Sequence, residues 1–321
     1  MTTKFESLPY ELIMTVIEYI DNPHLMFLNL NSNINRILFD HRIKLSVKIE
    51  DHRQIIPLQI NLTRLVVMHF KGENLQKIQN LKSLTLFIDE NIVDTLELPS
   101  SLIYFKIYFN ADMSPSLFQL LPTLKQLETL ILSNKKQSEV IFPLDSTVIS
   151  RNIKILQLKN IPVSISSIYH CEALTELKYL ELQLTEPSTS FHYTSFAFPS
   201  RLKTLIIQFQ LSFTDLEYVL QGCAGGNLKR LELYSHTNTS QPDYFSIKRW
   251  CILFERFQNL TKCKIDLRQR SRRGVFNNTC LQFAQQLETV NELKTKWNMK
   301  FYRSCPGYHG CLVYVNIVAN L

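Results

Sequence analysis

Apolar residues recur along most of the chain in one pattern: an apolar position, two variable positions, an apolar position, one variable position and another apolar position. The segments with this pattern begin at Leu62, Leu81, Leu102, Leu127, Ile153, Leu177, Leu202, Leu228, Leu260 and, as a final candidate, Leu312. Their starts are 19, 21, 25, 26, 24, 25, 26, 32 and 52 residues apart. Because the last two apolar positions alternate with a variable one, each segment predicts a short strand with one buried face.

Each of these strands needs a return segment, and several returns have helical patterns. "TDLEYVLQGCAGG" begins with a candidate N-capping residue, Thr214, and ends in glycines. "CLQFAQQLETVNELKTKW" predicts a further helix. "DYFSIKRWCILFERF" predicts another, with apolar residues broadly on one side: Phe245, Trp250, Ile252, Leu253 and Phe257.

The recurring segment resembles the leucine-rich repeat, L-x-x-L-x-L-x-x-N, over residues 45–320. The asparagine of that consensus is clearly present only as Asn110, so we expect irregular repeats without a regular asparagine ladder. The resemblance implies an α/β fold, a solenoid of parallel strands with helical or irregular returns. The alternative is an unrelated α/β domain with several leucine-rich strands.

Such an array points to binding, because its parallel strands form one curved sheet with the leucines buried behind it. The variable positions between the leucines then face out of the concave side. Tyrosine and arginine, which are frequent interface anchors, occur among them. The residues predicted to contact a protein partner are Tyr104, Lys106, Tyr108, Tyr179, Glu181, Arg230 and Tyr234. The alternative interpretation is a solvated sheet face.

Residues 7–38 follow a helical pattern instead. Ser7 is placed to cap a first helix, and Pro9 lies in its first turn. A wide apolar stripe follows at helical spacing: Leu12, Ile13, Val16, Ile17 and Ile20. The Asp-Asn-Pro at 21–23 separates a second helix, and Ile34, Ile37 and Leu38 fit a third. A segment this short does not bury the stripe alone, so the stripe must pack on the repeats, on a partner, or on both.

These N-terminal residues resemble an F-box. The family's pattern begins L-P-x-E-L/I, and the chain has Leu8-Pro9-Tyr10-Glu11-Leu12, then Val16-Ile17, Tyr19-Ile20-Asp21 and Leu25. An F-box followed by leucine-rich repeats is itself a known arrangement. The late V-x-K-x-W element of the family is replaced by "LNLNSNINRIL". The resemblance implies a small three-helix F-box over residues 1–45 and about nine to eleven irregular repeats over residues 46–321.

The resemblance implies a non-catalytic adaptor. F-box proteins dock their helical head on the Skp subunit of a Skp–cullin–F-box ubiquitin ligase and hold a protein substrate on their repeats. Leu8, Pro9, Ile17 and Leu25 match positions whose apolar side chains meet Skp. Catalysis then belongs to a ubiquitin-conjugating enzyme recruited elsewhere, near which the adaptor concentrates the substrate.

The alternative is a leucine-rich-repeat interaction scaffold whose helical head caps the first repeat and has no ubiquitin role. The stripe of Leu12, Val16, Ile17 and Ile20 separates the two hypotheses. Exposure of these side chains favours a missing partner, whereas burial against residues 45–70 favours a cap.

Charge and composition limit the partners and the cellular location that we expect for the chain. With 35 basic and 28 acidic residues the net charge is +7, which permits an acidic partner without requiring nucleic acid. Lys4, Glu6 and Glu11 interrupt the N-terminal apolar residues, so no signal peptide is predicted, and no long apolar run predicts a membrane span. Seven scattered cysteines fit reduced thiols. We therefore expect a cytoplasmic or nuclear protein.

Other candidate chemistry is sparse. The chain has no Gly-rich phosphate loop, H-E-x-x-H or nucleophile elbow, so we predict neither an enzyme nor a cofactor. "CPGYHGC" offers Cys305, His309 and Cys311 as metal ligands, but a turn is the simpler interpretation and no metal is predicted. The basic cluster "RQRSRR", from Arg268 to Arg273, fits a solvated loop, a nucleic-acid patch or a dock for an acidic segment.

Overall fold

The structure is a computed structural model of the chain. It describes residues 5, 8–20, 22–27, 32–38, 40, 44–50, 61–70, 75–89, 96–110, 113–138, 140–144, 147–185, 196–223, 226–237, 244, 246–270, 298–304 and 312–320. The chain divides into two compact units, Met1–Val140 and Ile141–Leu321. The predicted domain boundary after residue 45 lies inside the first unit and stays a prediction.

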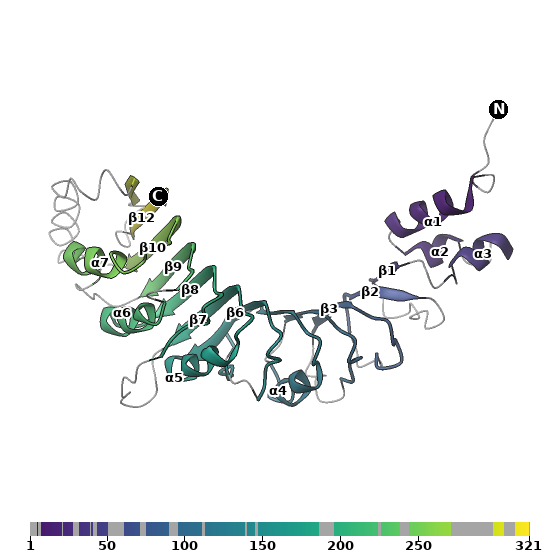
Figure 1. Ribbon diagram of the computed structural model, residues 1–321, viewed down its shortest axis with the longest axis horizontal. Helices are drawn as coiled ribbons and strands as arrows, with labels where there is room; N and C mark the ends of the chain where they lie inside the picture. Colours follow the sequence, from purple (N-terminus) through teal and green to yellow (C-terminus); the bar gives the residue numbers. More distant parts are fainter. Residues whose placement is uncertain are drawn as a thin grey trace. The chain divides into compact units, whose positions relative to one another are not determined.

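The first unit begins with three helices: α1 (Tyr10–Tyr19), α2 (Pro23–Phe27) and α3 (Ser32–Leu38). Strands then follow as β1 (Leu45–Ile49), β2 (Leu62–Val67), β3 (Ser83–Ile88), β4 (Tyr104–Phe109) and β5 (Thr129–Asn134). They lie side by side in this order, and every neighbouring pair is parallel (Figure 1). Between β4 and β5 the chain forms α4 (Leu117–Leu120) and a 3-10 turn, η3 (Leu121–Thr123).

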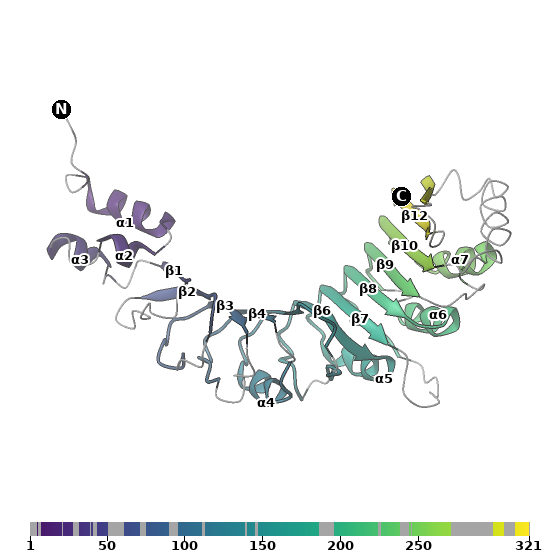
Figure 2. The same ribbon diagram turned by 180° about the vertical axis from the view of Figure 1, so that it is seen from behind.

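The second unit repeats the same plan with longer strands. They are β6 (Ile155–Ser164), β7 (Tyr179–Thr185), β8 (Thr204–Gln210), β9 (Arg230–Thr237) and β10 (Lys262–Arg270), again parallel and in order. The return helices are α5 (Ile165–Ile168), continued by η4 (Tyr169–Ala173), then α6 (Phe213–Gln221) and α7 (Ile247–Phe254). Figures 1 and 2 show α5, α6 and α7 on one side of these strands.

The predicted α/β class with parallel strands is confirmed, and the arrangement is compatible with a solenoid-like fold. Each strand from β2 to β10 lies on one of the nine recurring segments that begin between Leu62 and Leu260. Leu81 and Leu202, which lead their segments, are buried just before their strands begin. Burial of each such side chain contributes roughly 1.5–3 kcal/mol, so the repeated leucines stabilise every repeat.

The final candidate segment differs from the other nine. Residues from Leu312 do form a strand, β12 (Leu312–Asn320), but it pairs antiparallel with β10 and with β11 (Asn298–Ser304). Only residues 305–311 connect β11 to β12, which suits a hairpin and is too short for a parallel crossover. The prediction of a further parallel repeat there was therefore wrong.

Two helix details also differ from the prediction. The cap of α6 is Ser212, whose hydroxyl accepts a hydrogen bond from the backbone N–H of Asp215, 3.1 Å away. Thr214 lies one residue inside the helix, because the Ser212–Asp215 pair already satisfies the first-turn donor. In α7, Trp250 and Leu253 are buried as expected, but Ile252 is exposed.

The consensus asparagine lies on the surface. Asn110 is exposed, and its side-chain amide donates a hydrogen bond to the Asp89 carboxylate. His69 Nδ1 lies 2.7 Å from the other oxygen of the same carboxylate. The hydrogen bonds from Asn110 and His69 lower the pKa of Asp89 below its ordinary value. These side chains tie neighbouring turns together at the surface.

Candidate functional site

Helix α1 has one buried and one exposed apolar side. Ile13 and Ile17 are buried, and α1 contacts α3 and β1. Leu12, Val16 and Tyr19 are 52%, 38% and 87% exposed. Their spacing of four and then three residues places them on one line along the helix. We call these three residues, with Met26 of α2 (59% exposed), the head face.

The head is held to the sheet by polar contacts on its other side. The Tyr10 hydroxyl donates to the Asp40 carboxylate over 2.6 Å, and the side-chain oxygen of Asn22 accepts from the backbone N–H of Lys48 in β1. The backbone N–H of Lys44 donates to Glu18 over 3.0 Å. These bonds orient α1 and leave the head face outward.

The four residues predicted to contact a Skp subunit differ in their exposure to solvent. Pro9 is exposed and precedes α1, Leu8 is half-buried, and Ile17 is fully buried. Nothing is described of the Leu25 side chain, and Ser7, the predicted cap, lies outside the described residues. Of the wider stripe, Leu12 and Val16 are exposed and Ile20 is half-buried. The accessible apolar surface of α1 therefore includes Leu12 and Val16 of the motif and does not include Ile17.

The second unit presents a polar surface on the side of its sheet away from the return helices. Strand register aligns its residues in three rows from β7 to β10. The rows, which we call the open face, are Tyr179-Thr204-Arg230-Lys262, Glu181-Ile206-Glu232-Lys264 and Gln183-Gln208-Tyr234-Asp266. The alternate residues, such as Leu180 and Leu205, are buried on the opposite side.

Two carboxylates on the open face are nearly buried. The Tyr179 hydroxyl donates to Glu181 Oε2 over 3.1 Å, and the Tyr234 hydroxyl donates to Glu232 Oε2 over 2.7 Å. Arg230 also bonds Glu232, with Nε 2.8 Å from Oε1. Burial alone would raise the pKa of Glu232, but the hydrogen bonds from Tyr234 and Arg230 outweigh it and lower that pKa.

The tyrosines beside these carboxylates stay protonated. Burial, together with the neighbouring charge of Glu232, raises the pKa of Tyr234. Burial and the charge of Glu181 likewise raise the pKa of Tyr179. Both hydroxyls are therefore hydrogen-bond donors at neutral pH, and the Lys264 Nζ lies 5.0 Å from the Tyr234 ring centroid.

The predicted partner-binding residues of the first unit form a smaller aromatic patch. Tyr104, Lys106 and Tyr108 share one face of β4 and are half-buried. The Tyr108 ring stacks on Phe87 of β3 with centroids 4.4 Å apart, and the Lys106 Nζ lies 4.5 Å from the Tyr108 centroid. Phe87, Ile206 and Gln208 were not predicted as surface residues of the site, although the same period-two alternation places them there.

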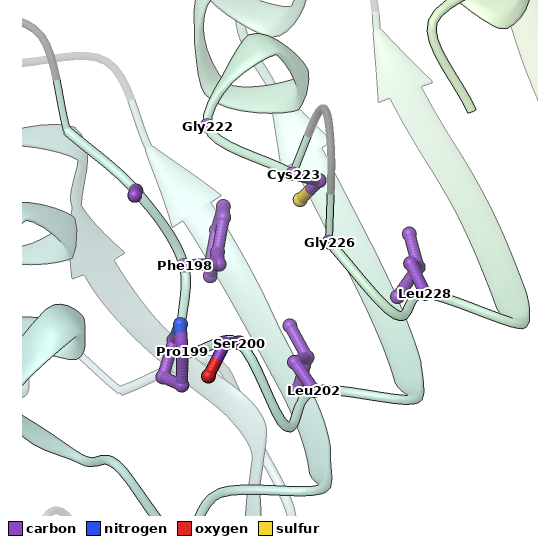
Figure 3. Close-up of a pocket in the computed structure, with 9 residues that line it drawn as sticks. Phe198, Pro199, Ser200, Leu202, Gly222, Cys223, Gly226 and Leu228 are labelled. Atoms are coloured by element: carbon purple, nitrogen blue, oxygen red, sulfur yellow. The ribbon is translucent and has the colours of Figure 1, made fainter. Parts of the chain in front are cut away.

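A small pocket of about 180 Å³ lies in the second unit, between the segment before β8 and the end of α6. Phe198, Leu202, Cys223 and Leu228 line it, as Figure 3 shows. Burial raises the pKa of the Cys223 thiol, which opposes thiolate chemistry there. The pocket has no charged side chain in its lining, so we assign it no ligand.

Other candidate chemistry falls partly outside the described residues. The "CPGYHGC" segment, the helix predicted over "CLQFAQQLETVNELKTKW" and Ser271–Arg273 of the basic cluster all lie outside them. Arg268 and Arg270 belong to β10 instead of a loop. Within the described residues, no group of three histidine, cysteine or acidic side chains is arranged to hold a metal ion. Among those residues, too, no helix has the length and apolar character needed to span a membrane.

No family model matches the chain, and no curated protein is significantly similar to it. The head face, the open face and the N-terminal motif are therefore the features of the chain that bear on its function.

Proposed function

We propose that this chain is a substrate-recognition adaptor of a Skp–cullin–F-box ubiquitin ligase. In this proposal the head face binds the Skp subunit, and the strands of the two units hold a protein substrate. The chain supplies no catalytic group of its own; it raises the concentration of the substrate near the ubiquitin-conjugating enzyme. The observation that carries the proposal is the exposed apolar line on α1, Leu12, Val16 and Tyr19.

An exposed apolar line on a short helix needs an explanation, because a single-chain protein usually buries such a face. On α1 the exposed side chains follow one another at positions i, i+4 and i+7, and Met26 of α2 is also exposed. A hydrophobic groove that binds an amphipathic helix contacts side chains at this same spacing. The match of residues 8–12 to L-P-x-E-L supports a Skp subunit as the partner.

The substrate half of the proposal rests on the sheet faces. The open face combines aromatic hydroxyls, an arginine and lysines around half-buried positions, and the patch around Tyr108 combines stacked rings with a lysine. Aromatic and arginine side chains held by neighbours lose little conformational entropy when a partner binds, which favours their use as anchors.

A second candidate function is a repeat scaffold without a ubiquitin role, in which the helices cap the first strand. The burial of Ile13 and Ile17 and the contacts of α1 and α2 with β1 favour it. A helix that only caps the first strand, however, buries one apolar side against the repeats and does not require apolar residues on its outer side. The exposure of Leu12 and Val16 is therefore what separates the two functions.

The experiment is a calorimetric titration of the purified chain with a purified Skp subunit. The double variant Leu12→Asp/Val16→Asp should weaken binding by about 100-fold or more, since it places two charges at the centre of the apolar contact. Ile252→Asp is the matched control, because Ile252 is an exposed aliphatic residue on another helix, α7. The control should bind like the unaltered chain.

Absence of binding by the folded, unaltered chain would overturn the proposal and leave the scaffold. Equal losses in the double variant and in Ile252→Asp would also count against it, because the head face would then have no special role. Circular dichroism of each variant shows that a loss does not come from unfolding.

A further inference from the structure

Four lysines occupy the same position of successive repeats in the second unit. Each is the second residue of its repeating segment, directly after the leading apolar residue: Lys154, Lys178, Lys203 and Lys229. The next segment has Thr261 at this position and Lys262 one residue later. We call the four residues with Lys262 the lysine row.

The row is fixed by the backbone. The N–H of Lys178 donates to the carbonyl of Lys154 over 2.8 Å, that of Lys203 to Lys178 over 2.9 Å, and that of Lys229 to Lys203 over 2.8 Å. The N–H of Thr261, the equivalent residue of the next segment, continues the ladder to Lys229 over 2.9 Å, and the N–H of Lys262 donates to the same carbonyl over 2.9 Å. Neighbouring strands are about 4.8 Å apart, so this ladder places one cation per strand along the edge where the strands begin.

The central cations of the row are accessible. Lys178, Lys203 and Lys229 are exposed, and within the described residues none of them forms an ion pair. Glu176, the acidic residue nearest in sequence to Lys178, is already paired with Arg201. A line of like charges this closely spaced is unfavourable by itself, and an anionic partner relieves the repulsion.

We propose that the lysine row binds an acidic segment of a protein partner, a run of carboxylates in a single extended or helical chain. This deepens the proposed function, on which it rests in one respect: the segment belongs to the protein that the sheet faces hold. The match is one of charge, since successive cations meet successive carboxylates. The net charge of +7 draws such a segment toward the protein.

The surroundings of the row favour a polypeptide over a nucleic acid. The open face beside it contains the nearly buried carboxylates Glu181 and Glu232. A broad phosphate surface would lie over these negative groups, whereas one narrow chain follows the row without covering them. The row itself consists of lysines, which are point charges, and not of the arginine forks that suit phosphate groups.

The test is fluorescence anisotropy with a labelled oligoglutamate peptide, using the full chain at low and at physiological ionic strength. The triple variant Lys178→Glu/Lys203→Glu/Lys229→Glu should weaken binding at least about tenfold. The affinity of the unaltered chain should fall as salt rises, because exposed charges carry the contact. The matched control, Lys77→Glu/Lys135→Glu/Lys136→Glu, changes three exposed lysines of the first unit that lie at other positions of their repeats, and it alters the net charge equally. It should retain binding.

No peptide binding at low salt, or equal losses in both triple variants, would overturn the proposal. A labelled single-stranded oligonucleotide is the comparison probe. Tighter binding of the oligonucleotide than of the peptide, lost in the lysine-row variant, would overturn it in favour of nucleic acid. The assay contains no Skp subunit, so its outcome is independent of the titration that tests the head face. Failure of one proposal is thus distinguishable from failure of the other.

Discussion

The Arg230 guanidinium and the Glu232 carboxylate form an ion pair within β9, with Nη2 of the arginine 2.6 Å from Oε1 of the glutamate. The two partners differ in environment: 7% of the Glu232 side chain is exposed, against 43% of the Arg230 side chain. The arginine therefore covers a carboxylate that the sheet would otherwise bury with a single partner, the Tyr234 hydroxyl.

Removal of the Arg230 side chain should destabilise the folded chain, because the Glu232 carboxylate stays nearly buried without its cation. We expect Arg230→Met to lower the free energy of unfolding at pH 7 by about 1–3 kcal/mol, because a nearly buried charge loses its cation. The control is Arg201→Met, which breaks a more exposed ion pair with Glu176 and should cost less than about 1 kcal/mol. Urea denaturation measures both. An equal cost at the two sites would contradict the burial argument.

The same pair predicts a pH dependence. The pKa of Glu232 is lowered in the folded chain, so its ion pair contributes stability above the unfolded pKa of about 4.3 and loses it as pH falls through the folded pKa. In Arg230→Met the folded pKa rises. The stability gap between the unaltered chain and the variant should therefore narrow as pH falls from about 5 through the lowered folded pKa of Glu232. Urea denaturation across this range checks it, and a gap independent of pH would be inconsistent with the assignment.

Two apolar residues of α1, one buried and one exposed, should differ in how strongly a charged substitution destabilises the chain. Ile17 is fully buried, so Ile17→Asp should unfold the head at a cost above about 3 kcal/mol. Leu12 is 52% exposed, and Leu12→Asp should change stability by about 0.5 kcal/mol or less. Limited proteolysis within residues 10–38 distinguishes the two variants. Similar protection of both variants would mean that α1 packs differently.

The cap of α6 gives a local prediction. Ser212→Ala should destabilise the second unit by about 1 kcal/mol, since the Asp215 N–H loses its acceptor. Thr214→Ala should have less than half that effect. Thr214 is exposed, and the substitution removes a hydrogen bond that its hydroxyl accepts from Arg249 over 3.3 Å. Thermal denaturation compares the two variants. A larger loss of stability from Thr214→Ala than from Ser212→Ala would indicate that Thr214 is the N-cap of α6.

Three thiols should be unreactive in the native chain. Cys171, Cys223 and Cys263 are buried, and burial raises their pKa values, that of Cys171 to about 12. Iodoacetamide at pH 8 should leave these three unlabelled until denaturant is added, because the thiolate is the reactive form. Peptide mass spectrometry locates the label. Rapid native labelling of Cys171 would show that its environment opens.

The fold was largely predictable because leucine spacing controls it. Leu81, Leu84 and Leu86 are all buried, and the same three positions recur in each later repeat. Strand β1 escaped the pattern because Arg42 stands where a leading apolar residue is expected. The direction of β12 was not predictable, since its sequence has the same alternation as a parallel strand and the short connection from β11 decides the pairing.

The candidate site was less predictable, for two physical reasons. Periodicity showed an apolar stripe on α1, but contacts with α3 and β1 decide that Ile13 and Ile17 are buried while Leu12 and Val16 are not. Alternation placed Glu181 and Glu232 on the open face, where charged residues are expected to be solvated. Their burial depends on tyrosine hydroxyls and an arginine two residues away, which no local pattern reports.

Hydrogen–deuterium exchange of the chain with and without a Skp subunit shows whether the head face binds this partner. We predict slower exchange in α1 and α2, residues 10–27, when the Skp subunit is present, and unchanged exchange in β6 to β10. Protection confined to the sheet, or no protection at all at concentrations that saturate a calorimetric titration, would contradict it.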